Sequence, residues 1–154
     1  MKIPLTLLSL GALPLSWRAL EDEPAPAPSP FGAFSVSLAV EDLEASRTFY
    51  GKLGFETVEE YGGERWAILR AGDITIGLFE GMFEDNMLTF NPGWNAQAEP
   101  VEDFTDVRAL QARFREAGLE PVLAIDPAAG DRGPASFVLA DPDGNPILFD
   151  QHVE

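Results

Sequence analysis

SVSLAVEDLEASRTFYGKLGF, residues 35 to 55, joins a strand pattern to a helix pattern and decides the fold. Apolar residues alternate with small or polar ones from Ala33 to Val40, as in a half-buried strand. Asp42 can cap a helix that Gly54 ends. The apolar face of that helix consists of Leu43, Phe49, Tyr50 and Leu53. The stretch therefore predicts a strand and a helix that packs one face on a sheet.

Three further strand patterns follow this helix. They cover Phe55 to Val58, Arg65 to Leu69 and Asp73 to Phe79, and the turn pairs Gly62-Gly63 and Ala71-Gly72 divide them. The first half of the chain thus predicts a strand, a helix and three strands.

The second half repeats this order. Met87 to Phe90 predicts a strand, and Thr105 or Asp106 caps a helix that Gly118 ends. The last three predicted strands are residues 121–125, 136–140 and 146–149. The repeat predicts an α+β fold of two βαβββ modules, about residues 31–80 and 86–154, that form an open, eight-stranded, barrel-like cleft.

The N-terminal residues have the pattern of a secretory leader. Residues 1–20 contain a lysine followed by an apolar run, which predicts a secretory signal peptide. The run is shorter than the roughly 20 residues of a spanning helix and contains Pro4 and Pro14, so we expect no stable transmembrane span. Residues 21–30 are a Pro-rich linker, and residues 31–154 are the predicted domain. We expect an exported protein, periplasmic or secreted.

Composition limits the chemistry. The chain has 26 acidic and 10 basic residues, a net charge of -16 that repels nucleic acid and favours cationic ligands. It has no cysteine, so thiolate chemistry and disulfides are excluded. Its single histidine, His152, cannot build a multi-histidine zinc site within one chain. We expect His152 to be a solvated terminal residue rather than a general base.

Residues 35–55 and DPDGNPILFD, residues 141–150, resemble the opening and the last hairpin of the vicinal oxygen chelate superfamily, which includes glyoxalases, bleomycin resistance proteins and extradiol dioxygenases. The resemblance covers about Phe31 to Glu154 and implies paired βαβββ modules around a cleft. Members commonly hold a divalent ion on four strand positions that face this cleft.

The positions that match those four ligands carry unsuitable side chains. They are Ser35, Gly77, Met87 (or a residue near Glu99) and Leu148. The resemblance therefore points to the metal-free branch typified by bleomycin resistance proteins, which bind a ligand in the cleft and often dimerise. We expect no cofactor and a homodimer.

The leading functional prediction is a metal-free protein that binds a small aromatic or cationic molecule in this cleft. Trp94 either lines the cleft or clamps a loop. An alternative is a metal-dependent lyase, isomerase or dioxygenase that uses Glu80 with Glu99 or Asp150, and a third is an interaction module that pairs through its sheet edges. The predicted ligand-binding residues are Ser35, Ser37, Trp66, Phe79, Met87, Thr89 and Trp94.

Overall fold

The computed structural model describes residues 29–154. The predicted signal peptide and nearly all of the predicted linker lie outside the described residues. The described elements are β1 (Ala33–Val40), α1 (Leu43–Lys52), β2 (Glu56–Gly63), β3 (Trp66–Ala71), β4 (Ile74–Glu80), β5 (Met87–Asn91), α2 (Val107–Glu116), a 3₁₀ turn (Pro127–Ala129), β6 (Ala135–Ala140) and β7 (Pro146–Gln151).

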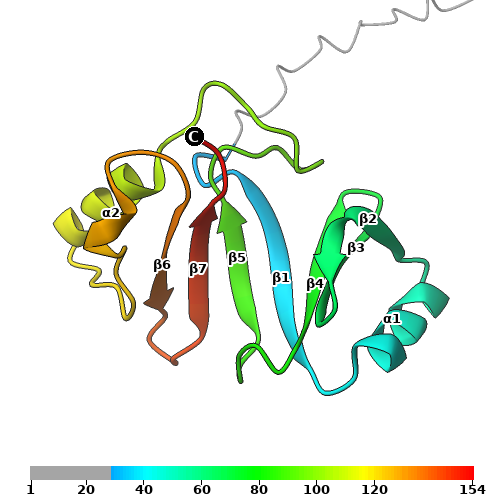
Figure 1. Cartoon of the computed structure of the whole chain (residues 1–154). Helices are drawn as coiled ribbons and strands as arrows, with labels where there is room; N and C mark the ends of the chain where they lie inside the picture. Colours follow the sequence, from blue (N-terminus) through cyan, green and yellow to red (C-terminus); the bar gives the residue numbers. More distant parts are fainter. Residues whose placement is uncertain (1–28) are drawn as a thin grey trace, which may run out of the picture.

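The strands form one open sheet in the order β2-β3-β4-β1-β5-β7-β6. Strands β1 and β5 pair antiparallel at its centre, a junction called the seam below. On either side β1 pairs parallel with β4 and β5 pairs parallel with β7. Figure 1 shows the two halves on either side of the seam, with α1 and α2 at opposite ends. The predicted α+β fold of two modules around an open sheet is confirmed.

Two details differ from the predicted strands. The segment 121–125 takes the eighth position through a single bridge between Leu123 and Val138. Pro121 has no N–H for a ladder, and Asp126 already caps the 3₁₀ turn, so little chain remains for a strand. The turn predicted at Gly62-Gly63 is wrong, because both glycines end β2 and the chain reverses at Glu64-Arg65.

A matched pair of hydrogen bonds reveals the internal repeat. In the first module the carboxylate of Glu80, the last residue of β4, accepts from the N–H of Leu43, the first residue of α1, at 3.0 Å. In the second the amide oxygen of Gln151, the last residue of β7, accepts from the N–H of Val107, the first residue of α2, at 2.8 Å. The two modules therefore share the same contact between the end of the last strand and the start of the helix.

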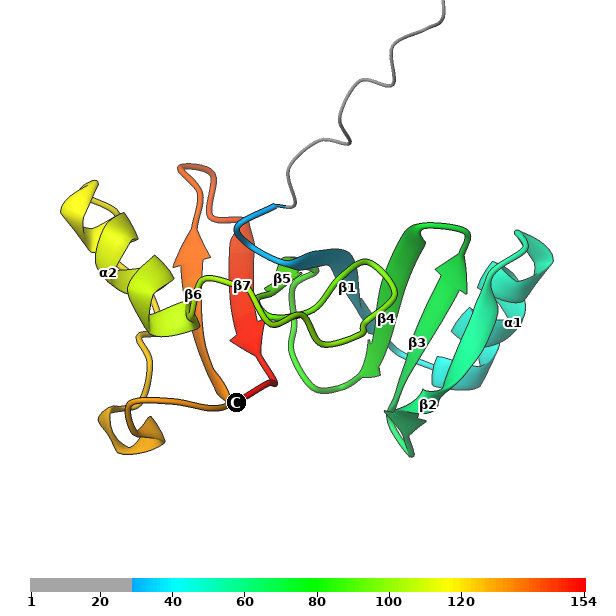
Figure 2. The same cartoon turned by 90° about the horizontal axis from the view of Figure 1, so that it is seen from above.

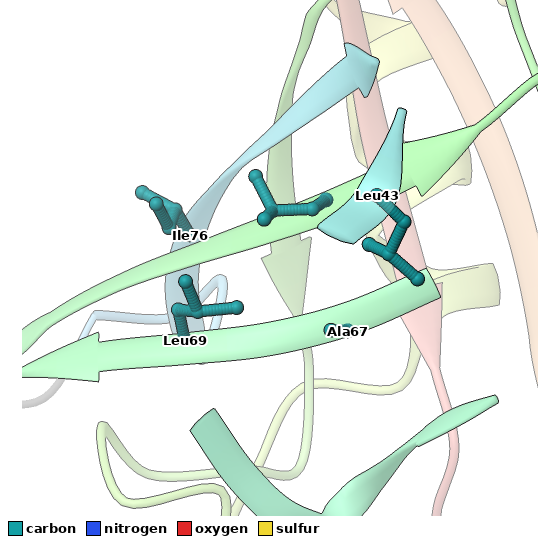
Figure 3. Packing of buried hydrophobic residues seen from close by; sticks show 5 residues of the cluster. Leu43, Ala67, Leu69 and Ile76 are labelled. Carbon is teal, nitrogen blue, oxygen red and sulfur yellow. The ribbon is translucent and has the colours of Figure 1, made fainter. Parts of the chain in front are cut away.

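Each helix covers one face of its own module. Asp42 caps α1 as predicted, since its side chain accepts from the Ala45 N–H at 2.8 Å. The core under α1 comprises Leu43, Ala67, Leu69, Ile76 and Leu78 (Figure 3). The second core comprises Val107, Leu110, Phe137, Leu139 and Phe149. Seen from above, the helices lie at the two outer ends of the curved sheet (Figure 2), and the alternate strand residues face the other way.

Candidate functional site

A cavity of about 580 Å³ lies on the face of the sheet turned away from the helices. Its wall includes residues from β1, β3, β4, β5 and β7 and from the loop after β5. Because strand side chains alternate between faces, residues 66, 68 and 70 of β3 line the cavity while Ala67 and Leu69 belong to the core. The residues predicted to bind a ligand all lie on this wall: Ser35, Ser37, Trp66, Phe79, Met87, Thr89 and Trp94.

Two hydroxyls join the modules at the floor of the cavity. The Ser37 Oγ and the Thr89 Oγ1 lie 2.8 Å apart across the seam, and both side chains are buried. This bond gives each buried hydroxyl a partner. It also fixes the central part of the floor from both halves at once.

The four positions that match superfamily metal ligands do not fit a divalent ion. Ser35, Met87 and Leu148 line the cavity and offer a neutral hydroxyl, a thioether and an alkyl group. Gly77 offers no side chain, and the ring of Phe79 occupies the space that a Cβ there would need. The donor set is therefore unsuited to the metal chemistry of the superfamily.

The carboxylates considered for a displaced metal site do not converge. Glu80 accepts from Leu43 at the start of α1, and Glu99 accepts from the Asn95 side chain at 3.0 Å. Of the three candidates only Asp150 is on the cavity wall. Within residues 29–154 no group of three or more His, Asp or Glu side chains is placed to hold a metal ion.

One end of the cavity is aromatic. The rings of Trp66 and Phe79 stack with their centroids 6.1 Å apart and 6° between their planes. The ring of Phe83 lies 5.1 Å from that of Phe79. Stacked rings of this kind give a flat apolar surface on which a planar ligand can lie.

The other end is ionic, which the sequence did not reveal. His152 Nε2 lies 3.1 Å from Asp150 Oδ2, and both residues line the cavity. The hydrogen bond to Asp150 raises the pKa of His152 above its ordinary value of 6.5, although partial burial opposes the rise. The imidazole also stacks on Trp94, centroid to centroid 4.7 Å. His152 is thus paired with Asp150 at the cavity wall, while its side chain stays 44% exposed, in line with the expected solvated terminal residue.

The loop after β5 closes one side of the cavity. Trp94 lines the cavity, and its ring lies 5.7 Å from that of Tyr61 on β2. The Tyr61 hydroxyl donates to the Ala98 carbonyl oxygen at 3.2 Å. The sequence left open whether Trp94 lines the cavity or clamps a loop. Trp94 does both, since it faces the cavity and holds the loop against the first module.

Sequence reasoning missed several polar and aromatic cavity residues, among them Tyr61, Arg70, Thr75, Phe83 and His152. Strand alternation could have found His152, because Leu148, Asp150 and His152 are spaced by two along β7 and its extension. Arg70 lies on the same face of β3 as Trp66, four residues further along the strand. The distance in sequence between Tyr61 and Trp94 left no signal for their contact.

Comparison with known structures supports the fold. A glyoxalase/bleomycin resistance protein/dioxygenase superfamily member from Vibrio splendidus is 19% identical, with a TM-score of 0.53 and coverage of 77% of this chain and 97% of that one. A protein described as an NAD-dependent benzaldehyde dehydrogenase from Legionella pneumophila is 14% identical, with a TM-score of 0.58 and coverage of 79% and 99%. An extradiol ring-cleaving dioxygenase from B. fuscum is 23% identical, with a TM-score of 0.50 and coverage of 84% of this chain but 35% of the other.

Identities this low establish similarity of fold and leave function open. A search of curated proteins finds no match to the chain. The family model described as Glyoxalase/Bleomycin resistance protein/Dioxygenase superfamily matches residues 32–149, which is most of the chain. The chain therefore belongs to the glyoxalase, bleomycin resistance protein and dioxygenase superfamily.

Proposed function

We propose that this protein binds a small aromatic molecule in the cavity between its two modules and does so without a bound metal ion. The observation that carries the proposal is the cavity itself, about 580 Å³ in volume and lined mainly by aromatic and apolar side chains with a few polar ones. That size and composition are typical of small-molecule sites.

The aromatic preference rests on the rings that face the cavity. The stacked pair of Trp66 and Phe79 forms one wall, and Trp94 approaches from the loop on another. A planar ligand placed on such a wall buries apolar area and gains stacking contacts.

The metal-free part of the proposal rests on the donor set. Divalent metal ions in proteins are bound mainly by carboxylate and imidazole side chains, and the matching positions hold Ser35, Gly77, Met87 and Leu148. The ionic pair of Asp150 and His152 supplies two donors to the same cavity. Most of the coordination shell would have to come from water or ligand.

Calorimetric titration with a panel of mono- and bicyclic aromatic compounds tests the binding function. We expect binding by some of the panel, and loss of at least about tenfold in affinity on Trp66→Ala because ring contact is removed. The matched control is Phe49→Ala, which removes an exposed aromatic ring on α1 that does not line the cavity. A panel with no binder tighter than about 1 mM would contradict the proposal.

Elemental analysis of native, untagged protein tests the metal-free function. We expect no stoichiometric transition metal, and no change in the melting temperature or in ligand affinity after treatment with a chelator. One iron, manganese, nickel or zinc ion per chain would instead support the alternative of a metal-dependent enzyme.

We also propose that the protein is exported through the leader at residues 1–20. The proposal rests on the apolar run there and the Pro-rich segment that follows. Expression of the full chain in a bacterium, followed by fractionation and mass spectrometry of the N-terminus, tests it. A protein that stays in the cytoplasm with residues 1–20 intact would contradict export.

A further inference from the structure

Arg70 is a cation that faces the cavity without a partner. Its side chain lines the cavity from β3, and its Nε is buried with no hydrogen-bond partner among the described residues. None of the ion pairs found within residues 29–154 includes it. Buried charged donors are nearly always paired, because an unpaired one keeps the full cost of its lost hydration. Arg70 as a whole is partly exposed, so this cost falls on its Nε–H, which suits an acceptor that the described chain does not supply.

The hydroxyl groups of Thr75 and Ser35 form a row with Arg70 across three neighbouring strands. Thr75 stands opposite Arg70 in the β3–β4 register. The parallel pairing of β1 with β4 places Val36 beside Ile76, which brings Ser35 next to Thr75 on the cavity face. Both side chains line the cavity, and neither hydroxyl has a hydrogen bond to another described residue. The row offers a guanidinium fork and two hydroxyl donors, the groups that bind carboxylate oxygens.

The aromatic wall lies next to this row. The ring of Phe79 covers Gly77, and Gly77 is two residues from Thr75 along β4, roughly 7 Å at the rise of a strand. A fused ring system that lies against Phe79 can therefore present a carboxylate on its edge to Arg70.

The charges around the cavity favour a single negative charge on the ligand. Asp150, the carboxylate on the wall, is hydrogen-bonded to His152 at the other end. A cationic ligand would meet the unpaired charge of Arg70. A phosphate with two charges would be repelled by a chain of net charge -16 and would find one guanidinium to bind it.

We propose that the ligand is an aromatic carboxylate whose ring lies on the wall formed by Phe79 and Trp66 and whose carboxylate is bound by Arg70, with Thr75 and Ser35 as further donors. This inference rests on the proposed function, because it names the class of ligand for the same cavity. It replaces the cationic ligand that the acidic composition suggested.

Three probes of one shape test the charge preference: 2-naphthoate, 2-naphthamide and 2-naphthylmethylammonium. In calorimetric titrations the wild type should bind the carboxylate at least about tenfold more tightly than the other two. Arg70→Met should abolish that preference by weakening binding of the carboxylate much more than binding of the amide. Arg115→Met removes the same charge from an exposed position on α2, where Arg115 pairs with Glu120, and should leave the preference intact.

The outcomes separate the two proposals. Equal affinity of the wild type for all three probes would overturn the carboxylate inference and leave the binding function standing. Failure of all three to bind would count against both. If Arg70→Met does not fold, Arg70→Lys decides: a lysine keeps the positive charge but loses the two-donor fork, so the preference for the carboxylate should shrink without vanishing. A preference equal to that of the wild type would overturn the inference.

Discussion

At the residue scale, Ser37 and Thr89 form a buried hydrogen-bonded pair in the floor of the cavity. Ser37 is 4% exposed and Thr89 6% exposed, so neither hydroxyl can exchange its partner for bulk water. Thr89→Val keeps the shape of the side chain but leaves the Ser37 hydroxyl buried and unpaired. It should lower the free energy of unfolding by about 1–3 kcal/mol.

The double variant Ser37→Ala with Thr89→Val removes both polar groups. In urea unfolding, the double variant should lose less free energy of unfolding than the two single variants lose together, because no unpaired hydroxyl remains. Strict additivity would mean that the two hydroxyls do not depend on one another.

His152 should titrate above its ordinary pKa. The hydrogen bond to Asp150 favours the protonated imidazole and raises the pKa of His152 above 6.5. The stability from this pair is therefore fully present below pH 6.5 and is lost as the pH rises through the higher pKa of the folded state. Because the chain has one histidine, its NMR titration curve can be assigned without ambiguity.

Asp150→Asn tests whether the hydrogen bond to Asp150 raises the pKa of His152. It should lower the pKa of His152 toward the ordinary value, and the fluorescence of Trp94, which stacks on the imidazole, should follow the same titration. An unchanged pKa in the variant would show that Asp150 is not the cause.

At the scale of elements, Glu80 and Gln151 each accept a hydrogen bond from the first residue of the helix in their own module. Since Gln151 accepts from α2 through an amide oxygen, Glu80→Gln should keep the bond to α1 and change the free energy of unfolding by less than about 0.5 kcal/mol. Glu80→Leu should lower it by about 1 kcal/mol, because the N–H of Leu43 loses its acceptor. Chemical denaturation measures both, with Glu84→Leu in an exposed loop as the control.

Much of the secondary structure and of the cavity wall could be predicted from the sequence. The alternation in β1 and the caps at Asp42 and Asp106 are local signals, and the structure confirms them. The same alternation predicted which residues face the cavity. The short eighth strand could not be predicted, because its pairing depends on how far Pro121 and Asp126 restrict the segment between them. The pair of His152 and Asp150 joins residues two apart along β7 and its extension, so the same alternation could have placed both side chains on one face.

At the scale of the whole molecule, the edge beside β6 predicts self-association. Val122 is 68% exposed and Leu123 62% exposed, next to a segment with few ladder bonds. Open edges with exposed apolar groups tend to pair with another chain. We expect a homodimer of twice the monomer mass in light scattering, and Leu123→Glu should shift it toward the monomer. A single species of monomer mass at high micromolar concentration would contradict this prediction.

The correspondence of Glu80 with Gln151 carries a last consequence, for the way a molecule sits in the cavity. It aligns the facing pair Trp66 and Phe79 of the first module with Ser136 and Asp150 of the second. The backbone is duplicated, but the side chains at the two ends have diverged, one toward rings and the other toward charge. A ligand with an aromatic ring at one end and a polar group at the other therefore has a single favoured orientation. In the reversed orientation its ring would lie against Asp150. The protein should accordingly distinguish positional isomers that have the same atoms and the same overall size.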